Sequence, residues 1–137
     1  MGRGYCFTCS SCHEVNTVLL GVGLFVLTDM FRTMEEVKDG KYGARRKALS
    51  EEYGISSVDV QYEFYECDHC GYWNTYKSLD MVFGSKENSV FYRYKHRCPK
   101  CRNVMIRKVF DGRKSLACQY FGKENLLSDA EPDLFWD

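Results

Sequence analysis

Residues 65–73 (YECDHCGYW) and residues 94–101 (YKHRCPKC) decide the fold of this 137-residue chain. Each stretch holds a C-x-x-C pair, Cys67 with Cys70 and Cys98 with Cys101. A C-x-x-C turn at the head of a β-hairpin, here called a knuckle, points both sulfurs the same way. Two facing knuckles make a tetrahedral four-sulfur site. The insert between the pairs is long, but it closes at small entropic cost. The two pairs therefore predict a metal site.

A third pair, Cys9 with Cys12, lies near the start of the chain. A four-sulfur site needs two knuckles, so this pair could replace either partner of the site above. It could also begin a second site that two further residues complete; the candidates are Cys6, His13, His69, His96 and Cys118. The sequence leaves the pairing of the three knuckles open.

Sulfur ligands in tetrahedral geometry favour zinc, with iron as the main alternative. We expect one zinc ion, and a second only if the remaining knuckle finds further ligands. On an extended strand His96 shares a face with Tyr94 and Cys98, so it could be a ligand, but hydrogen bonding or packing beside the metal is favoured. His13 and His69 are expected to be bystanders. Cys118 alone predicts a small buried apolar side chain.

The cysteines also indicate a compartment. Six of the eight form C-x-x-C pairs, a spacing typical of metal knuckles rather than of the scattered disulfides of secreted proteins. The apolar run from Thr17 to Leu27 lacks the flanks of a secretory signal. It is also shorter than the roughly 20 residues that a membrane-spanning helix needs. We therefore expect a cytoplasmic protein without a membrane segment.

Hydrophobic periodicity predicts an α+β fold in which antiparallel β-hairpins carry the knuckles. The predicted strands end or begin at the cysteines and include residues 17–27, 58–66, 72–83, 90–97, 104–110 and 115–121. Met30, Phe31, Met34 and Val37 recur at helical spacing, and a second helix is predicted over about 42–53. Together they form a two-helix insertion at about 29–54, between the first and second knuckle. We expect one domain over 1–122 and an acidic tail over 123–137.

Charge is unevenly distributed although the formal net charge is zero. Residues 86–114 hold ten Lys or Arg and two acidic residues. Basic residues with interleaved tyrosines can bind phosphates and stack bases. The candidate nucleic-acid-binding residues are Arg93, Lys95, Arg97, Lys100 and Arg102. The alternative is that the basic strand pairs across the sheet with Asp59, Glu63, Glu66 and Asp68, or that the acidic tail covers it.

Several motifs together resemble a group of small bacterial zinc-ribbon proteins common in Firmicutes. They are MGRGYCFTCSSC (1–12), LGVG (20–23), GKYG (40–43) and the two stretches quoted first. The resemblance covers residues 1 to about 105 and implies a bound metal without a particular activity. His13 and Arg102 stand where such knuckles usually carry glycine, so distortion of these two turns is expected.

A narrower resemblance joins CDHCGY and CPKC to the two iron knuckles of rubredoxin. It implies one-electron transfer. However, the acidic surface and compact size of rubredoxin are missing, and basic residues crowd the third knuckle.

Four cysteine ligands leave no open coordination position, so hydrolysis at such a site is not expected. The sequence thus favours a non-enzymatic zinc-ribbon interaction module, whose partner is either a protein or a nucleic acid. The alternative is a rubredoxin-like iron electron carrier. The sequence indicates neither the partner nor the oligomeric state.

Overall fold

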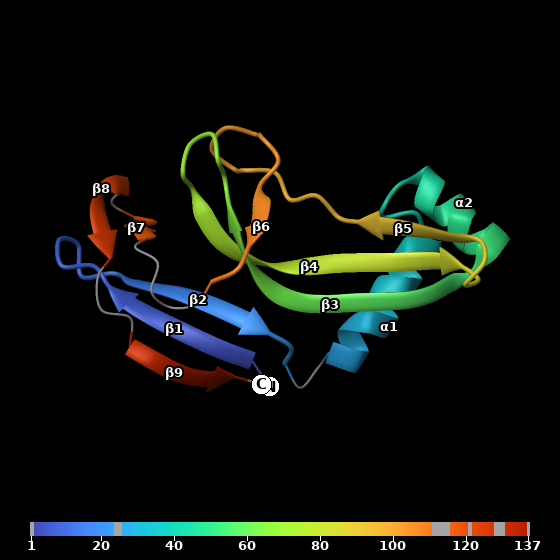
Figure 1. Cartoon of the computed structure of the whole chain (residues 1–137), viewed down its shortest axis with the longest axis horizontal. Helices are drawn as coiled ribbons and strands as arrows, with labels where there is room; N and C mark the ends of the chain where they lie inside the picture. The colour runs from blue at the N-terminus through green and yellow to red at the C-terminus, as the bar shows by residue number, and fades with distance from the viewer. Residues whose placement is uncertain (1, 24–25, 111–115, 121, 128–130, 137) are drawn as a thin grey trace. The chain divides into compact units, whose positions relative to one another are not determined.

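A computed structural model describes residues 2–23, 26–110, 116–120, 122–127 and 131–136. Figure 1 shows the helices and strands along the chain. They are β1 (Gly2–Thr8), β2 (Val15–Gly21), α1 (Val26–Lys38), α2 (Ala44–Tyr53), β3 (Ile55–Glu66), β4 (Trp73–Gly84), β5 (Ser89–Arg93), β6 (Ile106–Lys108), β7 (Leu116–Cys118), β8 (Gly122–Leu127) and β9 (Glu131–Trp136).

The strands form an antiparallel sheet. Its order is β5-β4-β3-β2-β1-β9, and β6 pairs with β3 off this path. A separate two-stranded sheet joins β7 to β8. With two helices between β2 and β3, this confirms the predicted α+β class and the position of the helical insertion.

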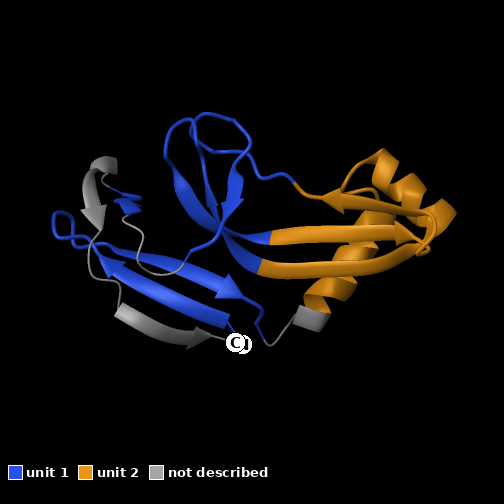
Figure 2. Cartoon of the chain, in the orientation of Figure 1, with its two compact units in different colours: residues 1–23, 62–77, 95–137 blue, residues 24–61, 78–94 orange. Residues whose placement is uncertain are grey.

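The chain divides into two compact units (Figure 2). Unit 1 comprises residues 1–23, 62–77 and 95–137, and unit 2 comprises residues 24–61 and 78–94. The strands β3 and β4 each contribute residues to both units.

The core of unit 2 joins the two helices to strand residues of β3 and β4. Val37 of α1 is fully buried with Val58, Met81 and Phe83, and Met34 packs against this cluster. Burial at positions 34 and 37 follows the helical period that the sequence indicated. Phe31 departs from the prediction, because its side chain is 67% exposed and lies outside the core.

Glycines end both helices. Gly40 has φ 84°, and its amide donates to the Val37 carbonyl. Gly54 has φ 75°, and its amide donates to the Ser50 carbonyl. Because L-residues with a β-carbon rarely adopt such φ angles, glycine suits both positions.

The predicted strand over 17–27 is wrong in its second half. The strand β2 ends at Gly21, which has φ 94°, and α1 already begins at Val26. Residues 24–25 lie outside the described residues. The apolar run thus serves two elements, and a continuous apolar stretch cannot by itself separate a strand from a helix start.

The core of unit 1 is aromatic. Phe64 is fully buried, and its ring centroid lies 5.8 Å from that of Trp73 and 5.3 Å from that of Phe110. Phe7 of β1 and Val18 of β2 pack into the same cluster. These contacts position the hairpin β1–β2, which carries the first knuckle at its tip.

Two strands lie where the sequence suggested only an acidic tail. The strand β8 pairs with β7, and β9 pairs with β1 in the register Gly2 to Trp136. Residues 128–130 and 137 lie outside the described residues. The prediction of a tail was based on amino-acid composition, which does not indicate that β8 and β9 form backbone hydrogen bonds with other strands.

The predicted strand over 90–97 is also shorter than expected. The strand β5 ends at Arg93, and beyond it an isolated bridge joins Arg97 to Val104. In the part of the chain that the structure describes, no helix has the length and apolar character needed to cross a membrane.

Candidate metal centres

The three knuckles share one backbone geometry. In each, the amide of the first cysteine donates to the carbonyl five residues later, that of Glu14, Tyr72 or Asn103. The amide of the residue after the second cysteine then donates back to the carbonyl of the first cysteine; the donors are His13, Gly71 and Arg102, and the acceptors are Cys9, Cys67 and Cys98. Three sequences with different intervening residues thus fold into the same turn.

The residue after the second cysteine is left-handed in all three turns. The φ angles are 60° at His13, 78° at Gly71 and 68° at Arg102. For residues other than glycine this conformation costs about 1–2 kcal/mol. The distortion expected at His13 and Arg102 is not found in the hydrogen bonds, because both turns keep the pattern of the glycine turn and retain the strain instead.

Backbone amides also point at the second sulfur of each knuckle. The amide of Asn103, together with its side-chain amide, lowers the pKa of Cys101 to about 6. The amide of Tyr72 acts in the same direction on Cys70, but burial and the neighbouring thiols outweigh it and raise the pKa to about 11. The amide of Glu14 is likewise outweighed at Cys12, whose pKa is raised by burial and by the thiols of Cys9 and Cys118. Such amides can offset the charge of metal-bound thiolates.

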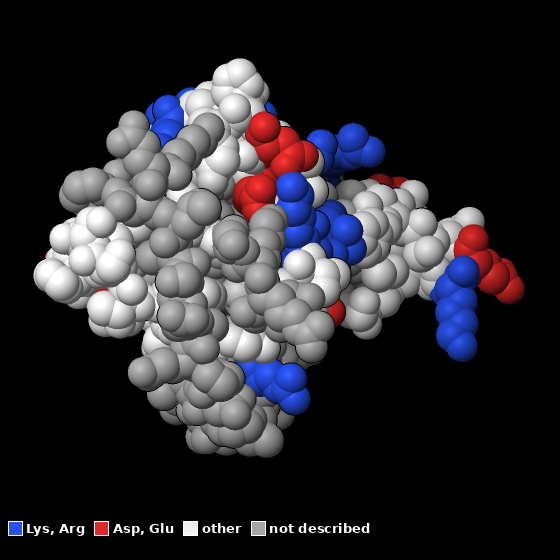
Figure 3. Space-filling model, turned by 60° about the vertical axis from the view of Figure 1, so that its left-hand side comes forward, with Lys and Arg blue, Asp and Glu red and all other residues white. Residues whose placement is uncertain are grey.

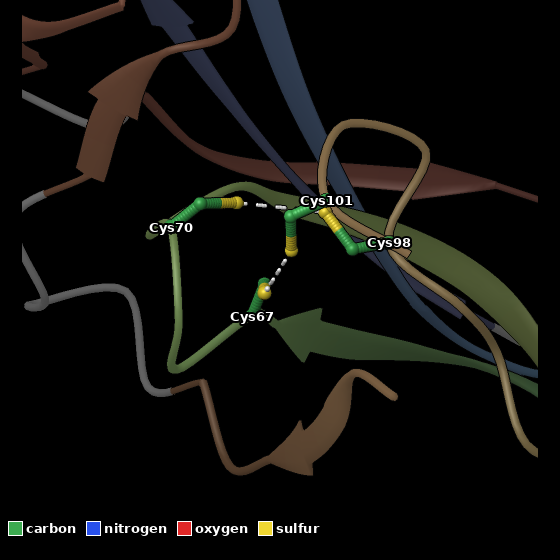
Figure 4. Close-up of side chains that lie close together, drawn as sticks. All are labelled: Cys67, Cys70, Cys98 and Cys101. Carbon is green, nitrogen blue, oxygen red and sulfur yellow. Dashed lines mark hydrogen bonds between the residues drawn. The ribbon is translucent and has the colours of Figure 1, made fainter. Parts of the chain in front are cut away.

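The second and third knuckles face each other. The Sγ atoms of Cys67 and Cys101 are 3.4 Å apart, and those of Cys70 and Cys98 are 3.5 Å apart. Figure 4 shows the four side chains converging from the loop after β3 and the loop before β6. All four sulfurs lie within 4.8 Å of one another.

These distances fit a tetrahedral metal. A Zn–S bond of about 2.3 Å places the sulfurs of a tetrahedron about 3.8 Å apart. The Cys67–Cys101 and Cys70–Cys98 sulfur pairs need to separate by only a few tenths of an ångström to reach that geometry. The structure thus brings Cys67, Cys70, Cys98 and Cys101 together as a group that could bind a metal ion.

His96 lies beside this group but does not belong to it. Its Nε2 atom is 2.8 Å from the Lys77 carbonyl, and its ring stacks on Tyr76 at 4.9 Å. Burial lowers the pKa of His96, and the contact with the Lys77 carbonyl only partly offsets this effect. His96 therefore packs against Tyr65 and Tyr76 of the cluster that holds these cysteines, and it is not one of the grouped ligands.

The first knuckle meets Cys118 rather than another knuckle. Cys9, Cys12 and Cys118 form a second group whose sulfurs lie within 4.8 Å of one another. The Sγ atoms of Cys12 and Cys118 are 3.7 Å apart. The sequence could name Cys118 only as one of several candidates, because a single cysteine 106 residues away from Cys12 carries no spacing signal.

A hydrogen-bonded clamp holds Cys118 at this position. Asn16, only 1% exposed, donates from Nδ2 to the Cys118 sulfur at 3.5 Å and accepts the Gln119 amide at 2.8 Å. Trp73 Nε1 donates to the Ala117 carbonyl at 2.6 Å, and Gln119 Nε2 donates to the Trp73 carbonyl at 2.8 Å. The segment that carries Cys118 is thus fixed on both sides.

The other candidate ligands are not in either group. Cys6 is partly buried on β1, where it alternates with the buried Phe7 and therefore points to the other face. His13 and His69 are exposed. Among the described residues, these three side chains do not join the two cysteine groups.

The basic residues around the third knuckle fall into two sets. Arg93 forms a two-atom ion pair with Asp80, at 2.9 and 3.1 Å. Within the described residues, no carboxylate pairs with the other four candidates for phosphate binding, which are exposed: Lys95, Arg97, Lys100 and Arg102. Arg97 instead donates to the Arg102 carbonyl at 3.2 Å.

Part of the basic excess is neutralised on β6. Arg107 pairs with Glu63 at 3.0 Å, and Lys108 pairs with both Glu66 and Asp68. On the face in Figure 3, acidic side chains lie directly beside basic ones. The predicted pairing of Glu63, Glu66 and Asp68 is therefore found, but with β6 rather than with the strand before the third knuckle. The end of the basic region, within residues 111–115, lies outside the described residues.

No protein-family model, no curated protein and no solved structure matches this chain. The candidate sites therefore depend on the geometry of the chain's own residues.

Proposed function

We propose that this chain is a non-enzymatic zinc-binding protein in which Cys67, Cys70, Cys98 and Cys101 hold one structural ion. The observation that carries the proposal is the convergence of four sulfurs from two knuckles of the same backbone geometry. A single buried cysteine can be explained as a small apolar side chain that packs in the core. It would not explain why four of them meet at the distances of a metal tetrahedron.

Zinc is the ion that this donor set favours. It tolerates a closed tetrahedral site of four thiolates and has no redox chemistry of its own. Iron in a rubredoxin-like site is the alternative, since four sulfurs also bind iron. We propose the reducing cytoplasm as its compartment, because cysteines paired as C-x-x-C are typical of metal knuckles rather than of secreted disulfide scaffolds.

The ion would act on the fold rather than on a substrate. Four protein ligands leave no coordination position for water or substrate. The ion would instead cross-link the turn between β3 and β4 to the loop before β6. We therefore propose a zinc-ribbon-like module that presents a fixed surface to a partner.

Metal content of the untagged full chain tests the proposal. We expect at least one zinc per chain after purification, and loss of that ion in Cys70→Ala. The control is Cys6→Ala, whose sulfur lies outside both cysteine groups and whose zinc content should equal that of the wild type. A red protein that undergoes reversible one-electron reduction would show that the bound ion is iron instead of zinc. Wild-type protein without stoichiometric metal would refute the site.

Four exposed cations favour a nucleic acid as the partner. Lys95, Arg97, Lys100 and Arg102 have no carboxylate partner among the described residues, so they are available for phosphates. We expect Lys95→Ala combined with Lys100→Ala to reduce the slope of log affinity against log salt by about 1.4 for single-stranded RNA or DNA. Lys41→Ala with Lys47→Ala, both exposed in unit 2, is the matched control. If both double variants bound the nucleic acid with the same salt dependence, or if the wild type bound none, the proposed partner would be a protein instead.

A further inference from the structure

We propose that Cys9, Cys12 and Cys118 form a second metal site, with three thiolate ligands and a fourth position open to water or a small anion. This site shares no residue with the four-cysteine site. It can therefore be present or absent independently of the function proposed above.

The first step of the argument is convergence. The Cys12–Cys118 sulfur distance of 3.7 Å is close to the separation of about 3.8 Å expected around tetrahedral zinc. Cys9 and Cys12 sit in a turn with the same hydrogen bonds as the two knuckles of the other site. A turn shaped for metal binding thus faces a third sulfur at metal-binding distance.

The second step is that the chain holds this arrangement at a cost. His13 keeps a left-handed φ of 60°, which is unfavourable for a side chain with a β-carbon. The buried Asn16 places its amide on the Cys118 sulfur, where it would donate to a thiolate. Cys9 and Cys118 are 2% and 1% exposed. A polar amide committed to a buried sulfur is the arrangement expected around a metal-bound thiolate.

The third step concerns the fourth ligand. All eight cysteines and all three histidines of the sequence lie within the described residues. Four cysteines belong to the other site, and neither Cys6 nor any histidine joins this group. No further cysteine or imidazole is therefore left in the chain to close the coordination.

The space for an added ligand lies beside Cys118. A cavity of about 30 Å³ is lined by Cys118 together with Trp73, Gln119, Cys70 and Lys100 among others. This volume is enough for a water molecule. Among the described residues, Lys100 is the one cationic residue that lines it, so an anion would be favoured there over a cation.

The two sites would then differ in chemistry. Four protein sulfurs close the first site, whereas three protein ligands leave an exchangeable position on the second, as in zinc sites that bind small ligands. The geometry thus points to a ligand-accepting metal site for water, hydroxide or a comparably small anion.

Cobalt(II) titration of the reduced, metal-free full chain under anaerobic conditions tests the proposal. We expect sulfur-to-cobalt charge-transfer absorbance to rise through two equivalents, because four thiolates and then three are coordinated. Azide should change the ligand-field bands of one of the two ions. Cys118→Ala should bind one equivalent and show no response to azide, whereas Cys6→Ala should behave like the wild type.

Two results on the wild-type chain alone would overturn the proposal, whether or not a variant folds. Saturation at one equivalent would mean that the chain holds one metal site rather than two. Two equivalents without any response to azide would mean that the fourth position is closed. If the single equivalent were lost in Cys67→Ala, the four-cysteine site would stand while the second site failed. Binding of no cobalt at all would refute both.

Discussion

Unit 2 contains no cysteine, whereas all eight cysteines lie in unit 1. Unit 2 has a continuous apolar core in which two helices pack on strand residues, with Val37, Met81 and Phe83 fully buried. In unit 1 the buried residues fall into two separate clusters, and each cluster includes one of the cysteine groups. The metal ions proposed above would therefore supplement apolar burial in unit 1, whereas neither cysteine group lies in unit 2.

Metal removal should give the largest difference between the units. Structural zinc contributes about 10–16 kcal/mol of apparent binding free energy in small domains. We expect strong chelation to remove hydrogen-exchange protection from residues 62–77 and 95–110, while amides of α1 and α2 keep theirs. Mass spectrometry of peptides from the two regions measures this. Equal loss in both units would show that unit 2 also depends on the metal.

Met81→Ala should produce the reverse pattern. Met81 is fully buried in the core of unit 2, and truncation of such a side chain costs about 2–5 kcal/mol. We expect a lower denaturant midpoint with unchanged zinc content per chain. The matched control is Phe31→Ala in the same unit, which should cost much less because Phe31 is 67% exposed. Loss of zinc in Met81→Ala would contradict the separation of the two cores.

Gly71→Ala should lower the stability of the protein by less than Met81→Ala. It tests the one knuckle that has glycine where the other two have His13 and Arg102. Gly71 has φ 78°, so an alanine there costs about 1–2 kcal/mol for the left-handed conformation. We expect the zinc-loaded protein to lose stability by that amount in denaturant titration. The control is His69→Ala in the same turn, which should be close to neutral because the His69 side chain is exposed and joins neither cysteine group. A neutral result for Gly71→Ala would mean that the turn can change shape while the metal stays bound.

Arg102→Gly should have the smallest effect, with the opposite sign. Glycine relieves the strain of φ 68° at this position but adds entropy to the unfolded chain, so we expect a net gain of about 0.5–1 kcal/mol. The same titration measures it, and salt dependence of nucleic-acid binding should be followed in parallel, because the substitution also removes a cation. A loss of stability would show that the Arg102 side chain contributes contacts that outweigh the strain.

The knuckles could be located from the sequence, but their pairing could not. A C-x-x-C spacing reports local turn geometry, which Cys9 and Cys12 share with the other two pairs. The partner of each turn depends on which strands lie side by side. For the first knuckle, that partner is Cys118, and it is placed by Asn16 and Trp73, residues without any ligand signature.

The helices and the longer strands were also within reach of sequence patterns. Alternating apolar residues in β3 indicate a strand with one buried face. Gly40 and Gly54 indicate helix ends, because both have positive φ angles. The strands β8 and β9 could not be predicted from the sequence, because acidic residues disfavour strands. The pairing of β9 depends on the edge of β1, which a sequence pattern does not report. Likewise Phe31 fitted the helical period but falls outside the buried stripe.

The strands β3 and β4 are 12 residues each, and they carry the second knuckle on their ends. Successive side chains of a strand point to opposite faces of the sheet, so the register of β3 sets which way every later side chain of the hairpin points. One residue inserted between Gln61 and Tyr62 would turn Phe64 from the core toward solvent and reverse the approach to Cys67. Two inserted residues would restore the facing but displace the turn by about 6–7 Å along the strand. The four-cysteine group thus depends on the parity and the length of the hairpin formed by β3 and β4.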